Sequence, residues 1–350
     1  MKKSFYLGWL CLFMVFTNLF AQEKNEKIEQ LDEVVVTATK FAIKKELVGK
    51  IIYQINAKEI ANLKGKSVVD VLDNIAGIQI NGVNSSAGKN KSTYIRGGRD
   101  RQVLVLIDGV PVSDPSGVNT TFDLRLLTLS QIESIEVMNG SASTLYGSGA
   151  ATGVINIKLK KSNEKPISLN YQASIGTNNS QNDSKLNGND INQNISINGT
   201  VDKFSYLTSF NTSKIDGLSE ALNSNSGVKF ENDALKATNT FVRIGFAFND
   251  KFNIQLFNNY DKDTYDYDAG ANADSDINNG ENKQVRFGIT SNFNYIKGSL
   301  LLTASYNKID RMFDSFNSWA NTTDHYEYTG KTTQIDEVNN YKIYDEIFIR

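Results

Sequence analysis

The sequence has little of what most catalytic sites require. Its 350 residues include one cysteine, one histidine and three prolines. Cys11 lies in an apolar N-terminal run, and removal of that run would leave no thiol for disulfides, thiolate catalysis or cysteine metal sites. His325 falls in a predicted long loop, and one histidine cannot build a multi-histidine metal site. We therefore predict no catalytic residues and no enzyme activity.

An excess of positive charge is also missing. The chain has 37 Lys and Arg residues against 39 Asp and Glu residues. No nucleic-acid partner is expected from this balance.

The N-terminus has the three-part layout of a secretory signal. Lys2 and Lys3 precede an apolar run at residues 5–20, and a polar stretch follows Ala21. The run is too short to cross a bilayer comfortably and has no stop-transfer pattern. We predict a signal peptide at residues 1–21 and export from the cytoplasm.

The second half of the chain has apolar residues on alternate positions. At residues 167–175, Ile, Leu, Tyr, Ala and Ile alternate with polar residues, which predicts a strand with one apolar face. Further strands are predicted near residues 190–199, 203–214, 238–248, 251–262, 284–295, 298–310 and 338–349. Their connections alternate between tight turns and long loops at 177–189, 215–237, 263–283 and 311–337, which is typical of a transmembrane β-barrel. A soluble β-sandwich remains the alternative.

Residues 51–161 look like a small domain of helices and strands. Residues 68–75 carry a buried helix stripe, and residues 103–107 form an apolar strand before the turn Asp108-Gly109. Residues 132–137 alternate apolar and polar positions, as a further strand would.

Four motifs in this domain resemble the plug domain of TonB-dependent outer-membrane receptors. They are Ile95-Arg96-Gly97, the LIDG turn at 106–109, IESIEV at 132–137, and the segment from Tyr146-Gly147 to the GVINI sequence at 153–157. The resemblance implies an α+β plug followed by antiparallel strands of a transmembrane β-barrel, in the outer membrane of a Gram-negative bacterium. The predicted domains are a periplasmic tail at 22–50, the plug at 51–161 and barrel strands at 166–350.

The stretch LDEVVVTATK at residues 31–40 resembles the TonB box of this family. A β-branched run after a charged tail offers a backbone edge that a sheet of the periplasmic protein TonB can extend. The resemblance implies that TonB is a partner and that the binding residues are Asp32, Glu33, Val34, Val35, Val36, Thr37 and Ala38. The alternative is that residues 34–36 form the first strand of the plug itself.

Four charged plug residues are expected to have structural roles. Arg96, Asp108, Glu133 and Glu136 lie in the plug motifs, and a charge inside a barrel must find a partner because an isolated buried ion is costly. We expect them to contact the barrel wall or neighbouring plug strands. For Glu133, an exposed strand position is the alternative.

The ligand is expected at the extracellular side, in the apical loops of the plug. The candidate residues are Lys91, Ser92, Thr93, Ser113, Asp114, Pro115 and Ser116. The resemblance implies active uptake of a scarce small molecule, with cobalamin favoured and a ferric siderophore next. The alternative is a surface binding or adhesion protein that transports nothing, or an inactive receptor fragment.

No cofactor is required, but an acidic stretch could bind calcium. Asp261, Asp263, Asp266 and Asp268 lie where a predicted strand leads into a loop, and calcium binds clustered carboxylate oxygens. A solvated acidic loop is the alternative.

The number of strands predicts an incomplete barrel. Plugged transporters have about 22 strands, whereas this sequence yields about eight, too few to enclose a plug. We predict an open sheet beside the plug, in a chain that is a truncated part of a longer receptor. A protease-resistant, heat-modifiable barrel formed by residues 22–350 alone would contradict that prediction.

Overall fold

The computed structural model describes residues 35–36, 43–44, 48–63, 65–83, 85–147, 149–177, 188–221, 230–270, 273–317, 319–344 and 347–349. The predicted signal peptide lies outside these residues. Among the residues described, none belongs to a helix that is long and apolar enough to cross a membrane.

The plug is built on a five-stranded sheet. Its strands are β3 (Ile52–Ile55), β6 (Val103–Ile107), β7 (Val110–Val112), β8 (Ile132–Asn139) and β9 (Gly153–Leu159), in the order β3-β8-β9-β6-β7. Strands β6 and β9 run parallel, and the other neighbours are antiparallel. The central strands β8 and β9 are buried along almost their whole length, so they anchor the plug core.

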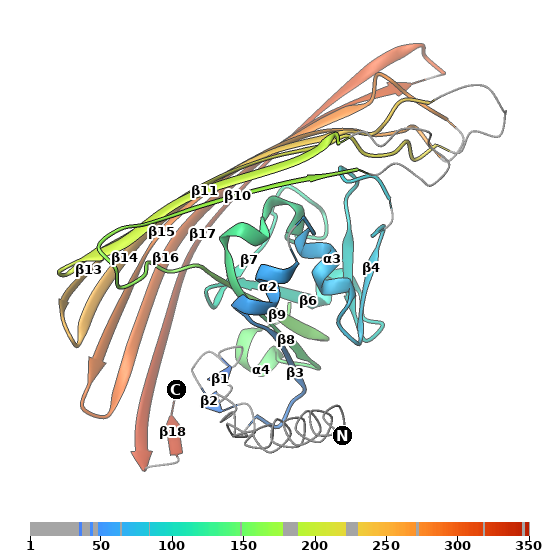
Figure 1. The fold of residues 1–350 in the computed structure, drawn as a ribbon. Helices are drawn as coiled ribbons and strands as arrows, with labels where there is room; N and C mark the ends of the chain where they lie inside the picture. Colours follow the sequence, from blue (N-terminus) through green and yellow to red (C-terminus); the bar gives the residue numbers. More distant parts are fainter. Residues whose placement is uncertain are drawn as a thin grey trace, which may run out of the picture. The chain divides into compact units, whose positions relative to one another are not determined.

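Short helices and a separate hairpin complete the plug (Figure 1). Helices α2 (Ala57–Asn62) and α3 (Val68–Asp73) each begin with a capping box, Asn56 with Glu59 and Ser67 with Asp70. Strands β4 (Ile78–Asn81) and β5 (Ser92–Ile95) form the hairpin, and α4 (Ser143–Tyr146) precedes β9. Three 3₁₀ turns span Asp100–Gln102 (η2), Leu124–Leu126 (η3) and Leu129–Gln131 (η4).

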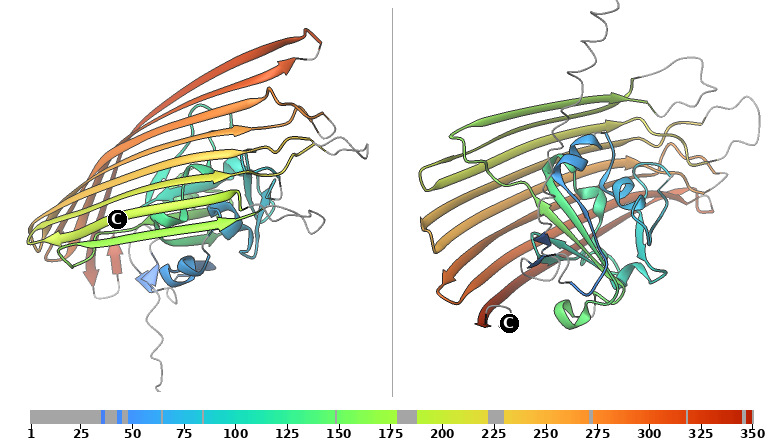
Figure 2. Two further views of the ribbon diagram at one scale, coloured as in Figure 1. Left: turned by 45° about the horizontal axis from the view of Figure 1, so that its top comes forward. Right: turned by 60° about the horizontal axis from the view of Figure 1, so that its bottom comes forward.

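The second half of the chain forms one open antiparallel sheet of nine strands, each paired with the next in sequence. The strands are β10 (Ser168–Gly176), β11 (Asp190–Val201), β12 (Phe204–Ile215), β13 (Leu235–Asn249), β14 (Phe252–Asp266), β15 (Asn279–Tyr295), β16 (Gly298–Asn317), β17 (Thr322–Tyr344) and β18 (Ile347–Ile349). Figure 2 shows them side by side, with β10 and β18 at the two edges. The predicted fold class, a plug followed by an incomplete antiparallel barrel sheet, is confirmed.

The two faces of the sheet differ in polarity. One face carries exposed apolar residues such as Phe204, Ile244, Leu256 and Phe287. Phenylalanine rings cluster at the tight-turn end of this face, where the rings of Phe248 and Phe252 stack with centroids 5.0 Å apart. The opposite face carries buried polar residues, including Asn194, Asn211, Asn239, Asn259 and Gln284. An outward apolar face with an aromatic girdle and a polar inner face is the pattern of a membrane barrel.

The last predicted long loop was wrong. Residues 311–337 continue β16 and begin β17, which pair from Gly298↔Tyr341 to Asn317↔Thr322. The strand predicted at 338–349 covers the end of β17, which reaches Tyr344, and β18, which begins at Ile347, so two strands share that span. His325 therefore lies in a strand. The loop predicted at 263–283 is also shorter, since β14 reaches Asp266 and β15 starts at Asn279. In these segments the strands extend past the apolar face, so alternating hydrophobicity, the signal used for prediction, is lost.

Candidate functional site

The polar face of the sheet holds the plug through two arginines. The guanidinium of Arg311, on β16, contacts the buried carboxylate of Asp114, with Nε 2.8 Å from Oδ2. The same guanidinium also donates to Asp123 Oδ2 at 3.2 Å and to Asn282 Oδ1 at 2.9 Å. One wall residue thus joins two plug carboxylates, and sequence analysis missed it because a lone arginine on a strand carries no local motif.

Asp123 forms a second ion pair with Arg125 inside the plug. Arg125 donates from Nη2 to Asp123 Oδ2 at 2.6 Å, and their side chains are 6% and 2% exposed. Burial alone would raise the pKa of Asp123, but the charges and hydrogen bonds of Arg125 and Arg311 outweigh burial and hold this pKa well below its usual range. The Arg125 guanidinium also lies 5.3 Å from the ring centre of Tyr265 on β14. This buried charge cluster therefore ties the plug to two strands of the wall.

The LIDG turn makes the other arginine contact. Asp108 adopts a positive φ of 52°, and its Oδ1 accepts a hydrogen bond from Leu159 N at 2.9 Å. Its Oδ2 pairs with Arg243 on β13. Arg243 also donates to Lys160 O at 3.1 Å, so one side chain binds both the turn and the end of the last plug strand.

The other three predicted structural charges have different surroundings. Glu136 is fully buried and pairs with Lys158 Nζ at 2.6 Å, which places it between neighbouring plug strands. Glu133 is half-buried, with Lys160 nearby. Arg96 is exposed and takes a positive φ of 51°. Only Asp108 of the four makes an ion pair with the sheet among the described residues.

The predicted apical residues do not form one open surface. Ser92 and Thr93 lie in strand β5 rather than in a loop, and Thr93 is buried. Lys91 Nζ donates to Gly82 O at 2.7 Å and to Ser86 O at 3.3 Å. Burial lowers its pKa.

The loop at residues 113–116 packs on the sheet. Asn307 Nδ2 donates to Ser113 O at 3.3 Å, and Arg311 Nε lies 3.1 Å from Ser116 Oγ. Pro115 and Ser116 approach Gly330 on β17 so closely that a Cβ there would lie 2.4 Å from Ser116 N. These contacts, together with Asp114–Arg311, make the loop part of the plug-to-wall attachment.

A cavity of about 1240 Å³ separates other parts of the plug from the sheet. It is lined by plug residues around α2, α3 and η4 and by residues of β10 to β13. Lys89, Lys91 and Arg125 give its plug side several positive charges.

The predicted TonB box is described at two positions. Val35–Val36 form β1, which pairs antiparallel with β2 (Ile43–Lys44) in a sheet of their own. Asp32, Glu33, Val34, Thr37 and Ala38 lie outside the described residues. The pair is separate from the five-stranded plug sheet, so Val35 and Val36 are not the first strand of that sheet.

The acidic stretch splits between a strand and a loop. Asp261 and Asp263 lie in β14 and are buried on its polar face, where Asn239 and Asn282 donate to them at 2.9 and 2.7 Å. Asp266 ends the strand. The stretch does lead from a strand into a loop, but the predicted start of the loop at residue 263 was wrong, because β14 extends further than its apolar pattern.

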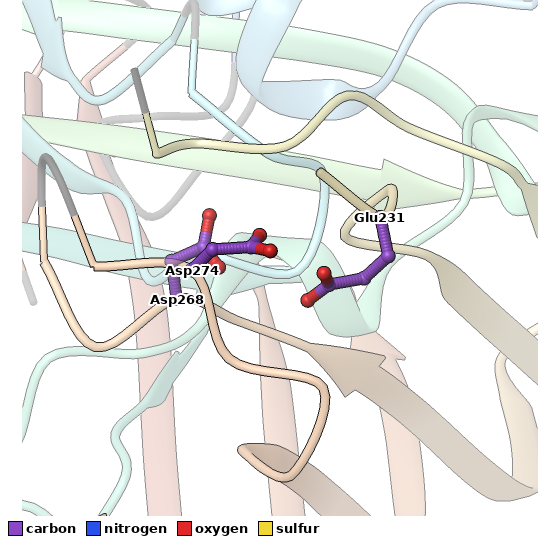
Figure 3. A group of neighbouring side chains, drawn as sticks. All are labelled: Glu231, Asp268 and Asp274. Atoms are coloured by element: carbon purple, nitrogen blue, oxygen red, sulfur yellow. The ribbon is translucent and has the colours of Figure 1, made fainter. Parts of the chain in front are cut away.

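Asp268 instead meets Glu231 and Asp274. One carboxylate oxygen of each lies within 4.8 Å of the others, and Figure 3 shows the Glu231 carboxylate pointing towards the two aspartates. Burial and the neighbouring Glu231 raise the pKa of Asp274 to about 6. Asp233, 1% exposed, has one carboxylate oxygen without a hydrogen-bond partner, and burial raises its pKa to about 7. Carboxylates in this arrangement must share protons or a cation.

Comparison with known proteins supports the resemblance of the plug. Residues 44–154 match the TonB-dependent receptor plug domain. The vitamin B12 transporter BtuB of Photobacterium profundum is 32% identical over 157 residues, which is 45% of this chain and 25% of that protein. The same transporter of Vibrio vulnificus is 34% identical over 158 residues, again 25% of its length.

Solved structures share the fold over most of the chain. A ferric enterobactin receptor of Pseudomonas aeruginosa superposes with a TM-score of 0.68 at 19% identity, over 88% of this chain and 48% of that one. The siderophore receptor PirA of Acinetobacter baumannii gives 0.66 at 20% identity, over 83% and 45%. The chain thus spans about half the length of these receptors.

Proposed function

We propose that the chain, whose residues 44–154 match the plug domain of TonB-dependent receptors, is such a receptor and acts in the active uptake of a scarce small molecule across an outer membrane. The observation that carries this proposal is the seating of the plug on the polar face of the sheet by Arg243 and Arg311. Such a plug blocks passage until it moves, so transport would require work on the plug.

We infer that TonB supplies this work through β1. A two-residue strand, paired with β2 alone among the described residues, leaves backbone groups that an incoming strand can use. Main-chain hydrogen bonds carry force along a strand without a large interface. We further propose that the predicted signal peptide directs export of the chain and that the chain resides in an outer membrane.

Cobalamin is the favoured ligand, and a ferric siderophore is the second candidate. The relatives with 32–34% identity are named vitamin B12 transporters. The structural neighbours at 19–20% identity are siderophore receptors, and likeness at that level supports only the fold.

Ligand binding can be measured on outer membranes from cells that express the protein. We expect saturable binding of radiolabelled cyanocobalamin that unlabelled cyanocobalamin displaces and a ferric catecholate siderophore does not. If the siderophore bound saturably and cyanocobalamin did not displace it, we would assign a ferric siderophore as the ligand instead of cobalamin. Binding of neither compound would favour the alternative of a surface binding or adhesion protein.

We also propose that the acidic group of Glu231, Asp268 and Asp274 binds calcium. Burial and then the charges of Asp268, Glu220 and Glu231 raise the pKa of the neighbouring Asp233, so a cation bound to this group would offset an excess of negative charge. Equilibrium dialysis should show calcium binding that Asp268→Asn weakens and Asp276→Asn, in the same loop, leaves unchanged. Unaltered binding in Asp268→Asn would remove this group from consideration, and Asp263→Asn would then test the residues of β14.

A further inference from the structure

A band of lysines follows the outer face of the sheet. We call the zone of exposed apolar side chains on this face the apolar belt. On β12 to β16, moving from the belt towards the β12–β13 and β14–β15 connections, the first charged residue on that face is a lysine. On β17 a lysine lies at the matching position, directly opposite Lys308. The six lysines are Lys214, Lys236, Lys262, Lys283, Lys308 and Lys331. We refer to them as the lysine band.

Strand alternation places the band on the outer face. Lys262 lies between Asp261 and Asp263, which are 1% and 4% exposed on the inner face, so its side chain points to the other side. Lys283 is flanked in the same way by the buried Asn282 and Gln284. The lysines therefore share the face of the exposed apolar side chains.

The register places the band at one depth. Three pairs lie directly opposite each other across neighbouring strands: Lys214 and Lys236, Lys262 and Lys283, and Lys308 and Lys331. From each pair to the next the position shifts by two residues, since Lys236 pairs with Thr264 and Lys283 with Asp310. Barrel strands tilt by about 35–45° and lie about 4.8 Å apart, so a line of constant depth moves by about one residue per strand. The observed shift matches this tilt.

The charges of the band are only partly compensated within the chain. Glu281 bridges Lys262 and Lys283 at 2.7 and 2.5 Å, and Asp310 pairs with Lys308 at 2.6 Å. Among the described residues, no ion pair involves Lys214, Lys236 or Lys331. Like charges directly opposite on a sheet repel each other, so an external anion would stabilise the pair Lys214 and Lys236.

We infer that the lysine band binds the phosphate-bearing headgroups of lipids in the leaflet at the long-connection end. On β14 to β16 the outward acids, such as Asp266 and Asp310, lie further from the apolar belt than the lysine of the same strand. On β17 Glu327 does too, whereas Glu337 lies on the belt side of Lys331, opposite Leu302. On β12 to β16 the first outward charge at the edge of the belt is therefore a cation, at the level where lipid phosphates meet the acyl region. This inference rests on the proposed placement of the sheet in an outer membrane.

Lipid selectivity tests the inference. The full chain is inserted into phosphatidylcholine vesicles that contain a trace of spin-labelled phosphatidic acid or spin-labelled phosphatidylcholine. Electron paramagnetic resonance then gives the relative association of each lipid with the protein. We expect a preference for phosphatidic acid of roughly threefold or more at low salt, which falls as salt screens the lysines.

Two triple variants distinguish an effect of the lysine band from an effect of the total charge of the protein. Lys214→Gln, Lys236→Gln and Lys331→Gln together should abolish the preference, because these lysines have no ion pair within the described chain. Lys58→Gln, Lys66→Gln and Lys161→Gln remove the same charge from exposed plug positions and should preserve it.

The outcomes distinguish this inference from the proposed function. Insertion with equal association of both lipids, or with selectivity that survives in the band variant, would overturn the lipid inference alone. Loss of selectivity in inorganic phosphate, but not in chloride of equal ionic strength, would overturn it in favour of a free-anion site. Absence of motionally restricted lipid in every sample would overturn both this inference and the membrane placement.

Discussion

At the scale of single residues, the plug is held by partners that lie far apart in sequence. Asp108 and Arg243 are 135 positions apart, and Asp114 and Arg311 are 197 apart. The LIDG motif predicts the turn at Asp108, because its positive φ and the backbone bond to Leu159 are local features. Its arginine partner depends on the register of β13, which no local pattern determines.

Arg311→Ala should destabilise the attachment of the plug. It leaves Asp114 and Asp123, both nearly fully buried, without one of their cations, and breaking a buried pair costs roughly 3 kcal/mol. Urea unfolding of the detergent-solubilised protein, followed by far-ultraviolet circular dichroism, should show this loss. Arg311→Lys should recover part of it, and Arg101→Ala, at an exposed position, should change little. An Arg311→Ala midpoint equal to that of the wild type would contradict the assigned role.

Asp123 predicts a sensitivity to acid. Burial raises its pKa, but the arginines more than reverse this, so the folded pKa lies below the unfolded value of about 4. The ionised form therefore stabilises the folded protein above about pH 4, and this stabilisation is lost as the pH falls. Urea midpoints between neutral pH and about pH 3 should decline less in Asp123→Asn than in the wild type. Asp250→Asn, in an exposed turn, should keep the wild-type slope; equal slopes for both variants and the wild type would count against the prediction.

At the scale of elements, the alternation of apolar and polar residues predicts the strand segments that carry exposed apolar side chains. It does not predict the strand segments beyond the apolar belt. Strands β11 to β15 were predicted at nearly their observed positions because their outward residues are apolar. The parts of β16 and β17 beyond the apolar belt carry Asp314, His325 and Glu327 instead, so the sequence pattern predicted a loop there. Their pairing is stabilised by backbone ladders and by stacked rings such as Phe313 and Tyr326, with centroids 4.8 Å apart.

The close approach of β17 to the plug loop can be tested at Gly330. A Cβ at this position would lie 2.4 Å from Ser116 N and 2.6 Å from the carbonyl carbon of Pro115, and such overlap forces the backbone to move. Gly330→Ala should therefore raise amide hydrogen exchange in residues 113–120 by at least about tenfold, equivalent to a cost of about 1.4 kcal/mol. Gly270→Ala has open space around it and should leave this exchange unchanged. Unchanged exchange in Gly330→Ala would show that the loop does not rest on β17.

At the scale of the whole molecule, the order of segments is a short strand, a plug and an open sheet. A short strand at Val35–Val36 precedes a plug, and the plug is fixed to the inner face of a sheet by a few buried ion pairs. Under the proposed function, a pull on this strand would have to break these buried pairs before the plug could move, and breaking each pair is costly. The plug motifs and the two-faced strands were sufficient to predict this order. Sequence resemblance favoured cobalamin over a ferric siderophore, but the residues expected to select the ligand lie in loops that follow no periodic pattern, so the choice stays a proposal.

Binding of the periplasmic domain of TonB to the full chain tests the central claim most directly. Isothermal titration calorimetry with detergent-solubilised protein should show binding of one domain per chain. Val35→Pro should abolish it, because proline removes a backbone donor and fixes φ, whereas Val35→Ile should retain it. Undiminished binding by Val35→Pro would contradict strand addition at β1, and absence of binding by the wild type would contradict the proposal that TonB drives this protein.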